Sequence, residues 1–336
     1  MLNISTLEKY DSKQMYKVYD SWAEIARKSF EFNHKSLNCG NVKHIIFSGM
    51  GGSGAIGDLF ESILAKSKIH INVVKGYRLP ETTDTESLVV VISVSGNTDE
   101  TLSILKSAHK IGSKIIAFSS GGKVQEYCEK NLIEYRKIRE YNSPRASFTS
   151  YLYSILKVLH TTLEIKEEDI LESINEMEKI SKIINSNNLS SENPSLVLAE
   201  FLKDIPIIYY PYGLRAAAIR FKNSLQENCK IHAMIENIVE TCHNGIVSWE
   251  TKSNVQPILI QGEEDFIKTK ERWKIVKEFF KSNNIEFFEI KSIKGSILSK
   301  IINLIYVLDF STIYFAVMLK IDPTPVKSID YIKSKL

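Results

Sequence analysis

The sequence predicts an α/β protein with two doubly wound domains, each built on a parallel sheet flanked by helices. Three features support this prediction. Continuous β-branched runs alternate with helical segments, which is typical of parallel strands buried on both faces. This alternation occurs twice, on either side of an Asn/Ser-rich segment at residues 185–195. The chain of 336 residues is also long enough for two hydrophobic cores.

The first half begins with a predicted helix over residues 14–36, in which apolar residues recur at helical spacing. Strands and helices alternate after it, and Gly112 is expected to end the second of these helices. Strands are predicted at residues 42–49, 70–76, 87–95 and 113–120 and at the end of 129–138, and helices at 53–66, 97–112 and 145–165.

The second half follows a charged helical stretch at about residues 166–187 and repeats the alternation. Strands are predicted at residues 205–213, 255–262 and 285–292, and helices at 214–230 and 270–283. We therefore expect an N-terminal domain at residues 1–163, a connection at 164–193 and a C-terminal domain at 194–336.

Residues 301–319 are apolar and long enough to span a membrane, but they include Asn303, Asp309 and Ser311, so a buried core helix is predicted.

Composition excludes several classes of function. The formal net charge of +3 is too small for a general nucleic-acid-binding surface. The four cysteines form no CxxC pair, which favours a reduced, cytoplasmic protein. The first residues lack a basic segment followed by an apolar core, so no secretory signal is expected. We therefore expect no nucleic-acid partner and no membrane partner.

A glycine-rich loop follows the first strand, where Gly49, Gly51 and Gly54 match GxGxxG between a strand and a helix. Such a loop lets backbone N–H groups and a helix N-terminus approach an anion. NAD is disfavoured because Lys75 and Arg78 stand where an acidic residue would bind the ribose. Three interpretations of this loop remain open: an NADP site, a site for a smaller phosphate, and a tight turn without a ligand. A P-loop is excluded, because no Gly-Lys-Ser/Thr follows.

A second loop repeats the arrangement after the strand at residues 87–95. Ser93, Ser95 and Thr98 lie where this strand turns into a helix, and Asn97 with Glu100 resembles a capping box. Hydroxyl groups and free N–H groups at one helix start are suited to a monophosphate. Because the two loops follow strands of one sheet, they are expected to meet in a crevice at the carboxyl ends of the strands.

Together, "GMGGSGAIGD" and "SVSGNTDETL" resemble the sugar isomerase (SIS) fold of phosphosugar-binding proteins. The segments "NSPRAS", "FKNSLQENCK", "ETCHNGIVSW" and "DPTPVKSIDYIKSKL" follow the order found in archaeal-type bifunctional phosphoglucose/phosphomannose isomerases. The resemblance covers nearly the whole chain. It implies two SIS domains and an aldose–ketose isomerase that interconverts glucose 6-phosphate, and also mannose 6-phosphate, with fructose 6-phosphate through an enediolate. It further implies no metal or organic cofactor, a homodimer, and a place in glycolysis or gluconeogenesis.

The resemblance also implies roles for individual residues. Glu227 matches the base that moves the proton, and His243 matches the ring-opening histidine, which the neighbouring subunit supplies in the family. Arg145 matches the arginine near the enediolate oxygens, and Lys333 matches the C-terminal lysine near the ring oxygen, with Lys335 as a competitor. The substrate phosphate is expected on Gly51, Gly52, Ser53, Ser93, Ser95 and Thr98.

Alternatives remain open for these residues. By residue type alone, Glu227, Arg145 and Lys333 are solvated surface charges and His243 is a structural histidine. The chain departs from the family at Cys242 and Gly245, beside the histidine, where the family carries other residues. A SIS protein that binds a phosphosugar without turning it over, or acts on another substrate, is the alternative function, and an NADP oxidoreductase is a third. Cys242, His243 and His232 lack the further ligands that a metal site needs.

Overall fold

The computed structural model describes residues 2–335, and the chain divides into two compact units. The β1–β5 unit comprises Ser21–Glu178 and Gly295–Ile301. The β6–β9 unit comprises the described residues up to Asp20, Lys179–Lys294 and those from Ile302 onward. Unlike the expected domains, these units are not continuous in sequence. The first residues belong to the unit of the second sheet, where the hydroxyl of Tyr306 donates to the Tyr19 carbonyl at 2.5 Å.

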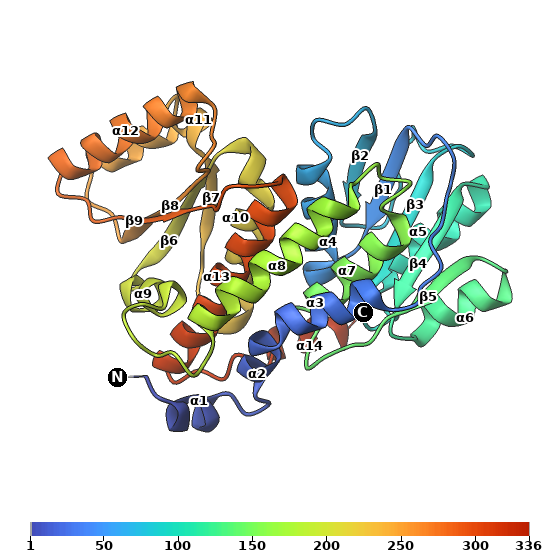
Figure 1. Cartoon of the computed structure of the whole chain (residues 1–336), viewed down its shortest axis with the longest axis horizontal. Coiled ribbons are helices and arrows are strands. Elements are labelled where there is room, and N and C mark those ends of the chain that lie inside the picture. Colours follow the sequence, from blue (N-terminus) through green and yellow to red (C-terminus); the bar gives the residue numbers. More distant parts are fainter. Residues whose placement is uncertain (1, 336) are drawn as a thin grey trace. The chain divides into compact units, whose positions relative to one another are not determined.

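The β1–β5 unit contains a five-stranded sheet in which all pairings are parallel, with the order β2-β1-β3-β4-β5 (Figure 1). Phe47 of β1 lies opposite Val73 of β2 and Val90 of β3. The predicted strands are confirmed, and each is shorter than its apolar run. The strands are β1 (His44–Ser48), β2 (His70–Val74), β3 (Leu88–Ser93), β4 (Lys114–Ser119) and β5 (Glu134–Lys137).

Helices cover both faces of this sheet. Crossovers between parallel strands are right-handed, so α4 (Gly51–Ile63) lies on one face, and α5 (Asp99–Ile111) and α6 (Gly122–Lys130) lie on the other. On the α4 face, Phe47 stacks on Phe60 with ring centroids 4.7 Å apart. On the α5 and α6 face, a buried apolar cluster joins the strands to both helices. Gly112 ends α5 in the left-handed region, as predicted.

The helix predicted over residues 14–36 is two helices, α2 (Met15–Asp20) and α3 (Trp22–Glu31). In a continuous helix the carbonyl of Tyr19 would accept a bond from the backbone four residues later. That carbonyl also accepts the Tyr306 hydroxyl, and the two helices are separated at Ser21. Helix α3 then packs against α7 (Phe148–Leu159), and the indole N–H of Trp22 donates to the Ala146 carbonyl at 2.9 Å.

The β6–β9 unit contains a four-stranded parallel sheet in the order β7-β6-β8-β9 (Figure 1). Helix α10 (Arg215–Ser224) joins β6 to β7 and α12 (Ile267–Ser282) joins β8 to β9, so the same handedness puts them on opposite faces. Strand β7 has no counterpart among the predicted strands. The strands are β6 (Ile205–Tyr210), β7 (Met234–Asn237), β8 (Val255–Gln261) and β9 (Phe288–Lys291).

Helix α13 (Ile297–Met318) is the apolar segment that is long enough to cross a membrane, with a mean hydropathy of 1.8. In the structure 94% of its most apolar window is buried. Its polar residues are used internally: the carboxylate of Asp309 pairs with Arg220 at 2.7 Å, and Asn228 donates to Thr312 at 2.8 Å. The prediction of a buried core helix is therefore confirmed.

The remaining elements connect these parts. Residues 212–214 and 245–250 form short 3₁₀ turns, and residues 225–229 form a π-helical turn directly after α10. The remaining helices are α1 (Ile4–Tyr10), α8 (Glu167–Ile184), α9 (Pro194–Phe201), α11 (Ile238–Thr241) and α14 (Lys327–Lys333).

Candidate active site

The strand order of the β1–β5 unit has its switch point between β1 and β3. From β1 the chain crosses through α4 to β2, and from β3 it crosses through α5 in the opposite direction to β4. Ligands of open α/β sheets bind in the crevice that such a reversal leaves at the carboxyl ends of the strands. The two loops that the sequence singled out follow β1 and β3, so they border this crevice.

Hydrogen bonds organise the predicted phosphate-binding hydroxyls. The Ser93 hydroxyl donates to Thr98 Oγ1 at 3.2 Å and accepts from the Gly96 N–H at 3.1 Å. The Ser95 hydroxyl accepts from the Asn97 N–H at 3.3 Å. Ser53, from the other loop, accepts from the Val94 N–H at 3.4 Å, which joins the two loops. The first turn of α5 begins at this cluster, so its unpaired N–H groups favour an anion there.

The predicted capping box is wrong. Thr98, not Asn97, is the N-cap of α5, and no side chain caps the helix. The Asn97 amide donates to the Ser95 carbonyl at 3.1 Å and accepts from the Lys123 N–H at 3.1 Å. The side chain of Asn97 therefore fastens the loop to the start of α6 and leaves the first N–H groups of α5 uncapped by any side chain.

Arg145 lies beside the first glycine loop. A Cβ at Gly52 would come within 3.3 Å of the Arg145 nitrogen and of the Pro144 carbonyl, so a side chain here would require the backbone of this segment to shift by a few tenths of an ångström. Arg145 is 3% exposed, which excludes the alternative of a surface arginine. The segment is held by Ser147, whose hydroxyl accepts from the Tyr141 N–H at 2.8 Å and donates to the Ser143 carbonyl at 2.9 Å.

Lys75 is one of the two cations that could bind the extra phosphate of NADP, and it forms an ion pair within the protein. Its ammonium group contacts both carboxylate oxygens of Asp58 on α4, at 2.6 and 2.5 Å, and the Asp58 side chain is only 5% exposed. A buried carboxylate needs such a partner, because leaving it unpaired is costly. The NADP alternative therefore loses one of its cations.

The switch point of the second sheet lies between β6 and β8 and differs in chemistry. After β8, the Gly262 N–H donates to the carboxylate of Asp265 at 2.9 Å, and the same oxygen accepts the Trp273 indole N–H at 3.0 Å. The Gly262 N–H, which could otherwise donate to a bound phosphate, thus donates to a carboxylate of the protein itself. Among the described loops that follow β1, β3 and β8, the two of the first switch point carry the hydroxyl groups and uncapped N–H groups that suit a phosphate.

Glu227 lies in the π-helical turn Leu225–Cys229 that follows α10. Such turns are rare and occur frequently at functional sites. Glu227 is half-buried, between the buried residues Leu225 and Asn228. The turn ends at Lys230 in the left-handed conformation, whose ammonium group donates to the Glu227 carbonyl and to the Pro323 carbonyl. Glu227 is therefore part of a fixed turn rather than of a frayed helix end.

His243 is exposed in the turn after α11, and its N–H donates to the Glu240 carbonyl at 2.8 Å. Helix α10 runs from the carboxyl edge of β6 to the amino edge of β7, so Glu227 lies toward the amino edge. His243 follows β7 at the carboxyl edge. The ten residues of α10, about 15 Å of helix, separate the two edges. The structure therefore does not bring Glu227 and His243 of one chain together.

Lys333 is the last residue of α14 and is exposed, as is its competitor Lys335.

At Gly245, a Cβ would lie 2.3 Å from a carboxylate oxygen of Glu236. This oxygen also accepts the Thr241 hydroxyl at 2.8 Å. The space that a side chain at residue 245 would take is thus occupied by the Glu236 carboxylate from β7.

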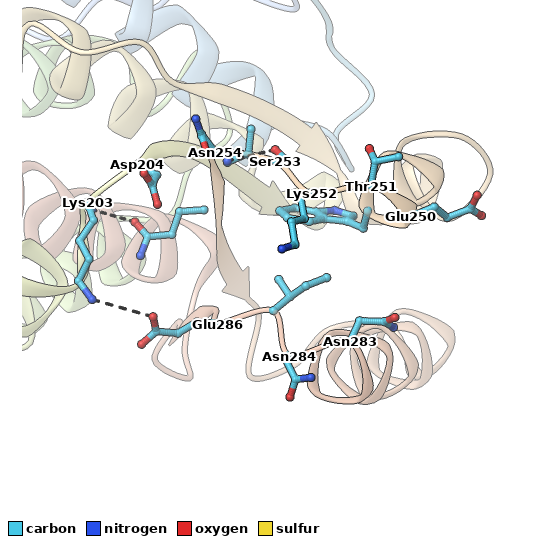
Figure 2. Close-up of a pocket in the computed structure, with 14 residues that line it drawn as sticks. Lys203, Asp204, Glu250, Thr251, Lys252, Ser253, Asn254, Asn283, Asn284 and Glu286 are labelled. Carbon is cyan, nitrogen blue, oxygen red and sulfur yellow. Dashed lines mark hydrogen bonds and ion pairs between the residues drawn. The ribbon is translucent and has the colours of Figure 1, made fainter.

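A cavity of about 690 Å³ opens elsewhere in the β6–β9 unit (Figure 2). Its lining residues precede β6, β8 and β9, which places it at the amino edge of the sheet. Lys203 and Glu286 pair across it at 4.0 Å, and Asn254, Asn283 and Lys252 border it. None of the predicted site residues lines it.

Within residues 2–335 no group of three His, Cys, Asp or Glu side chains is arranged to hold a metal ion.

Comparison with known proteins identifies the class first. A family profile described as "SIS domain" matches residues 40–159, and one described as "Bacterial phospho-glucose isomerase C-terminal SIS domain" matches residues 191–336. A hypothetical protein from Thermus thermophilus superposes with a TM-score of 0.72 at 12% identity, over 98% of this chain and 88% of its own. The C-terminal domain of glucosamine-fructose-6-phosphate aminotransferase from Francisella tularensis gives 0.69 at 18% identity, over 93% and 98%. The fold is that of a double SIS protein.

The sequence relatives narrow the class to a family. A bifunctional phosphoglucose/phosphomannose isomerase from Caldicellulosiruptor bescii is 30% identical over 96% of this chain and 98% of its own length. A protein of the same name from Aquifex aeolicus is 28% identical over 96% and 98%. The chain belongs to the family of bifunctional phosphoglucose/phosphomannose isomerases. A D-glucosamine-6-phosphate 4-epimerase from Sulfolobus acidocaldarius is also similar, at 26% identity over 74% of this chain and 78% of its own.

Proposed function

We propose that this protein interconverts glucose 6-phosphate and mannose 6-phosphate with fructose 6-phosphate by proton transfer between C1 and C2. The observation that carries the proposal is the pair of joined loops at the β1–β3 switch point, in a chain of this family. Buried hydroxyls, uncapped N–H groups of α5 and the glycine approach at Gly52 suit the phosphate of a hexose 6-phosphate.

Each step of the reaction has a candidate residue. The Glu227 carboxylate removes a proton from C2 of the open-chain aldose and returns it to C1, giving the ketose. The guanidinium of Arg145 stabilises the negative charge that develops on the enediolate oxygens. His243 and Lys333 assist proton transfer at the ring oxygen. Because glucose and mannose 6-phosphates differ only at C2, both give the same enediolate.

We also propose that the working form is a cytoplasmic homodimer in which His243 acts in the neighbouring subunit's site. The position of Glu227 and His243 toward opposite edges of one sheet supports this arrangement, since a single chain separates them by the length of α10. In this form the protein would serve glycolysis and gluconeogenesis.

The proposal is tested by a coupled assay of the purified protein with each hexose 6-phosphate and with glucosamine 6-phosphate. We expect turnover of glucose, mannose and fructose 6-phosphates. Glu227→Gln keeps the shape of the side chain but removes the base, so kcat should fall about 10³-fold while the phosphate still binds. Glu271→Gln, on the exposed surface of α12, is the matched control and should keep full activity.

Two outcomes would contradict the proposal. If the wild-type protein binds hexose 6-phosphates without turning them over, it is a binding protein of this fold. If Glu227→Gln keeps wild-type kcat, the base is another residue.

A further inference from the structure

Two buried charges lie beneath the turn that carries Glu227. Arg220, on α10, is 2% exposed, and Asp309, on α13, is fully buried. Arg220 donates through Nε at 2.8 Å and Nη2 at 2.7 Å to one carboxylate oxygen of Asp309. The Ser224 hydroxyl donates to the other oxygen at 2.7 Å. The carboxylate is thus satisfied on both oxygens, as a buried charge requires.

The same stretch of α13 holds the turn on its other side. Asn228 donates through its amide to the Thr312 hydroxyl at 2.8 Å, and Cys229 donates its thiol to the Thr312 carbonyl at 3.1 Å. The Thr312 hydroxyl in turn donates to the Asp309 carbonyl at 2.6 Å. Ser224 precedes Glu227 and Asn228 follows it, so α13 anchors the backbone on both sides of Glu227.

The buried pair also interacts electrostatically with Glu227. Burial lowers the pKa of Arg220, but Asp309, Tyr19 and Glu227 outweigh burial and leave the pKa above its usual value. Burial raises the pKa of Asp309, Glu227 raises it further, and Arg220 and Ser224 act against this rise. We regard Asp309 as ionised, because three donors within 2.8 Å converge on its two oxygens. An ionised pair adds no net charge beside Glu227.

We propose that Arg220 and Asp309 are positioning residues for the reaction: the buried pair fixes the π-helical turn, and thereby the direction of the Glu227 carboxylate, without changing the charge around it. This inference rests on the proposed function. A misplacement of about 1 Å in a reacting group can cost about 100-fold in rate, so a pair that touches no substrate can still control turnover.

The test removes both charges together. Arg220→Met with Asp309→Leu replaces the pair by apolar residues of similar volume, a change that buried ion pairs often tolerate. We expect kcat to fall about 100-fold, with KM within about threefold, because the residues predicted to hold the phosphate belong to the other unit. Amide hydrogen exchange of residues 225–229, measured by mass spectrometry, should become faster, and this readout does not depend on the reaction.

Asp20→Asn is the matched control. Asp20 belongs to the same unit and accepts from the Ser186 N–H at 2.9 Å and the Ser186 hydroxyl at 2.6 Å, so its loss should lower Tm without changing kcat. A folded double variant with wild-type kcat, or with unchanged exchange at residues 225–229, overturns the inference. Should the double variant fail to fold, Ser224→Ala, which keeps both charges and removes only the 2.7 Å bond between the turn and Asp309, decides by the same kcat-against-KM comparison. If neither folds, the pair is purely structural and the inference is rejected.

The wild-type protein is measured first, and this separates the two proposals. Absence of hexose 6-phosphate turnover in the wild-type protein is a failure of the proposed function. Wild-type turnover that survives removal of the pair is a failure of this inference alone.

Discussion

Gly52 shows how a single hydrogen atom in place of a side chain shapes the site. A Cβ at this position would press on backbone atoms of Pro144 and Arg145 at 3.3 Å, and backbone cannot swing aside as a flexible side chain does. We expect Gly52→Ala to displace the Arg145 segment and to raise KM for glucose 6-phosphate about tenfold, which corresponds to about 1.4 kcal/mol of lost binding. Steady-state kinetics and Tm measure the effect.

Gly76→Ala is the control for this substitution, because a Cβ at Gly76 meets nothing within 4 Å. It should leave KM unchanged. A Gly52→Ala enzyme with wild-type KM and kcat would show that the close approach of the two segments does not matter for binding.

The sequence identified these residues but not their surroundings. The paired loops were predictable because glycine and hydroxyl residues follow buried strands, a pattern with a direct physical reason. The Ser53–Val94 bond, the contact between Gly52 and the Arg145 segment, and the Arg220–Asp309 pair join residues far apart in the chain. No local pattern encodes such contacts, so only the structure reveals them.

The N-terminus of α13 illustrates how one helix can cap another. Glu172, on α8, accepts from the Ser296 N–H at 3.0 Å and from the Ser299 hydroxyl at 2.8 Å. The Ser296 hydrogen bond is the largest cause that holds the pKa of Glu172 below its usual value, against the opposing effect of burial. A carboxylate at this end also complements the helix dipole.

This capping predicts a pH-dependent stability. Because the folded-state pKa of Glu172 is lowered, its stabilisation is complete above the unfolded pKa of about 4.3 and is lost as pH falls through the folded value. Glu172→Gln should cost about 1 kcal/mol at pH 7, since the site is partly exposed, and less at about pH 3. Urea unfolding at both pH values measures this. Glu126→Gln, exposed in the middle of α6 and away from any helix N-terminus, should change stability at neither pH.

Helices and strands differed in how well the sequence predicted them. Buried parallel strands such as β3 and β8 were found because their apolar runs are continuous. Strand β7 was missed because it spans only four residues, Met234–Asn237, and two of these are polar. The π-helical turn was not predicted, and the residues on both sides of Glu227 bond to α13, more than 80 residues further along the chain. The break between α2 and α3 lies beside a carbonyl that accepts from the distant Tyr306, a contact that no local pattern predicts.

The assembled molecule offers a test of the proposed dimer. If His243 acts in the neighbouring site, Glu227→Gln and His243→Ala chains should complement each other. In a mixed dimer, one site holds both defects and the other holds both intact residues. Random exchange of subunits makes half of the dimers mixed, so the mixture should recover about a quarter of wild-type activity.

The controls for complementation are the two variants measured separately after the same exchange procedure. Each should remain at its own low activity. A mixture no more active than the average of the separate variants would place both residues in one chain's site, and the proposed sharing of sites would be wrong.

The carboxylate of Asp265, which accepts the Gly262 N–H after β8, has a consequence for how many ligands the protein takes up. The four strands of the second sheet follow the same order as the first four of the first sheet, yet in the second crevice a side-chain carboxylate already accepts from a backbone N–H. Isothermal titration calorimetry with a non-reacting sugar-phosphate analogue should therefore give a stoichiometry of one per polypeptide, not two.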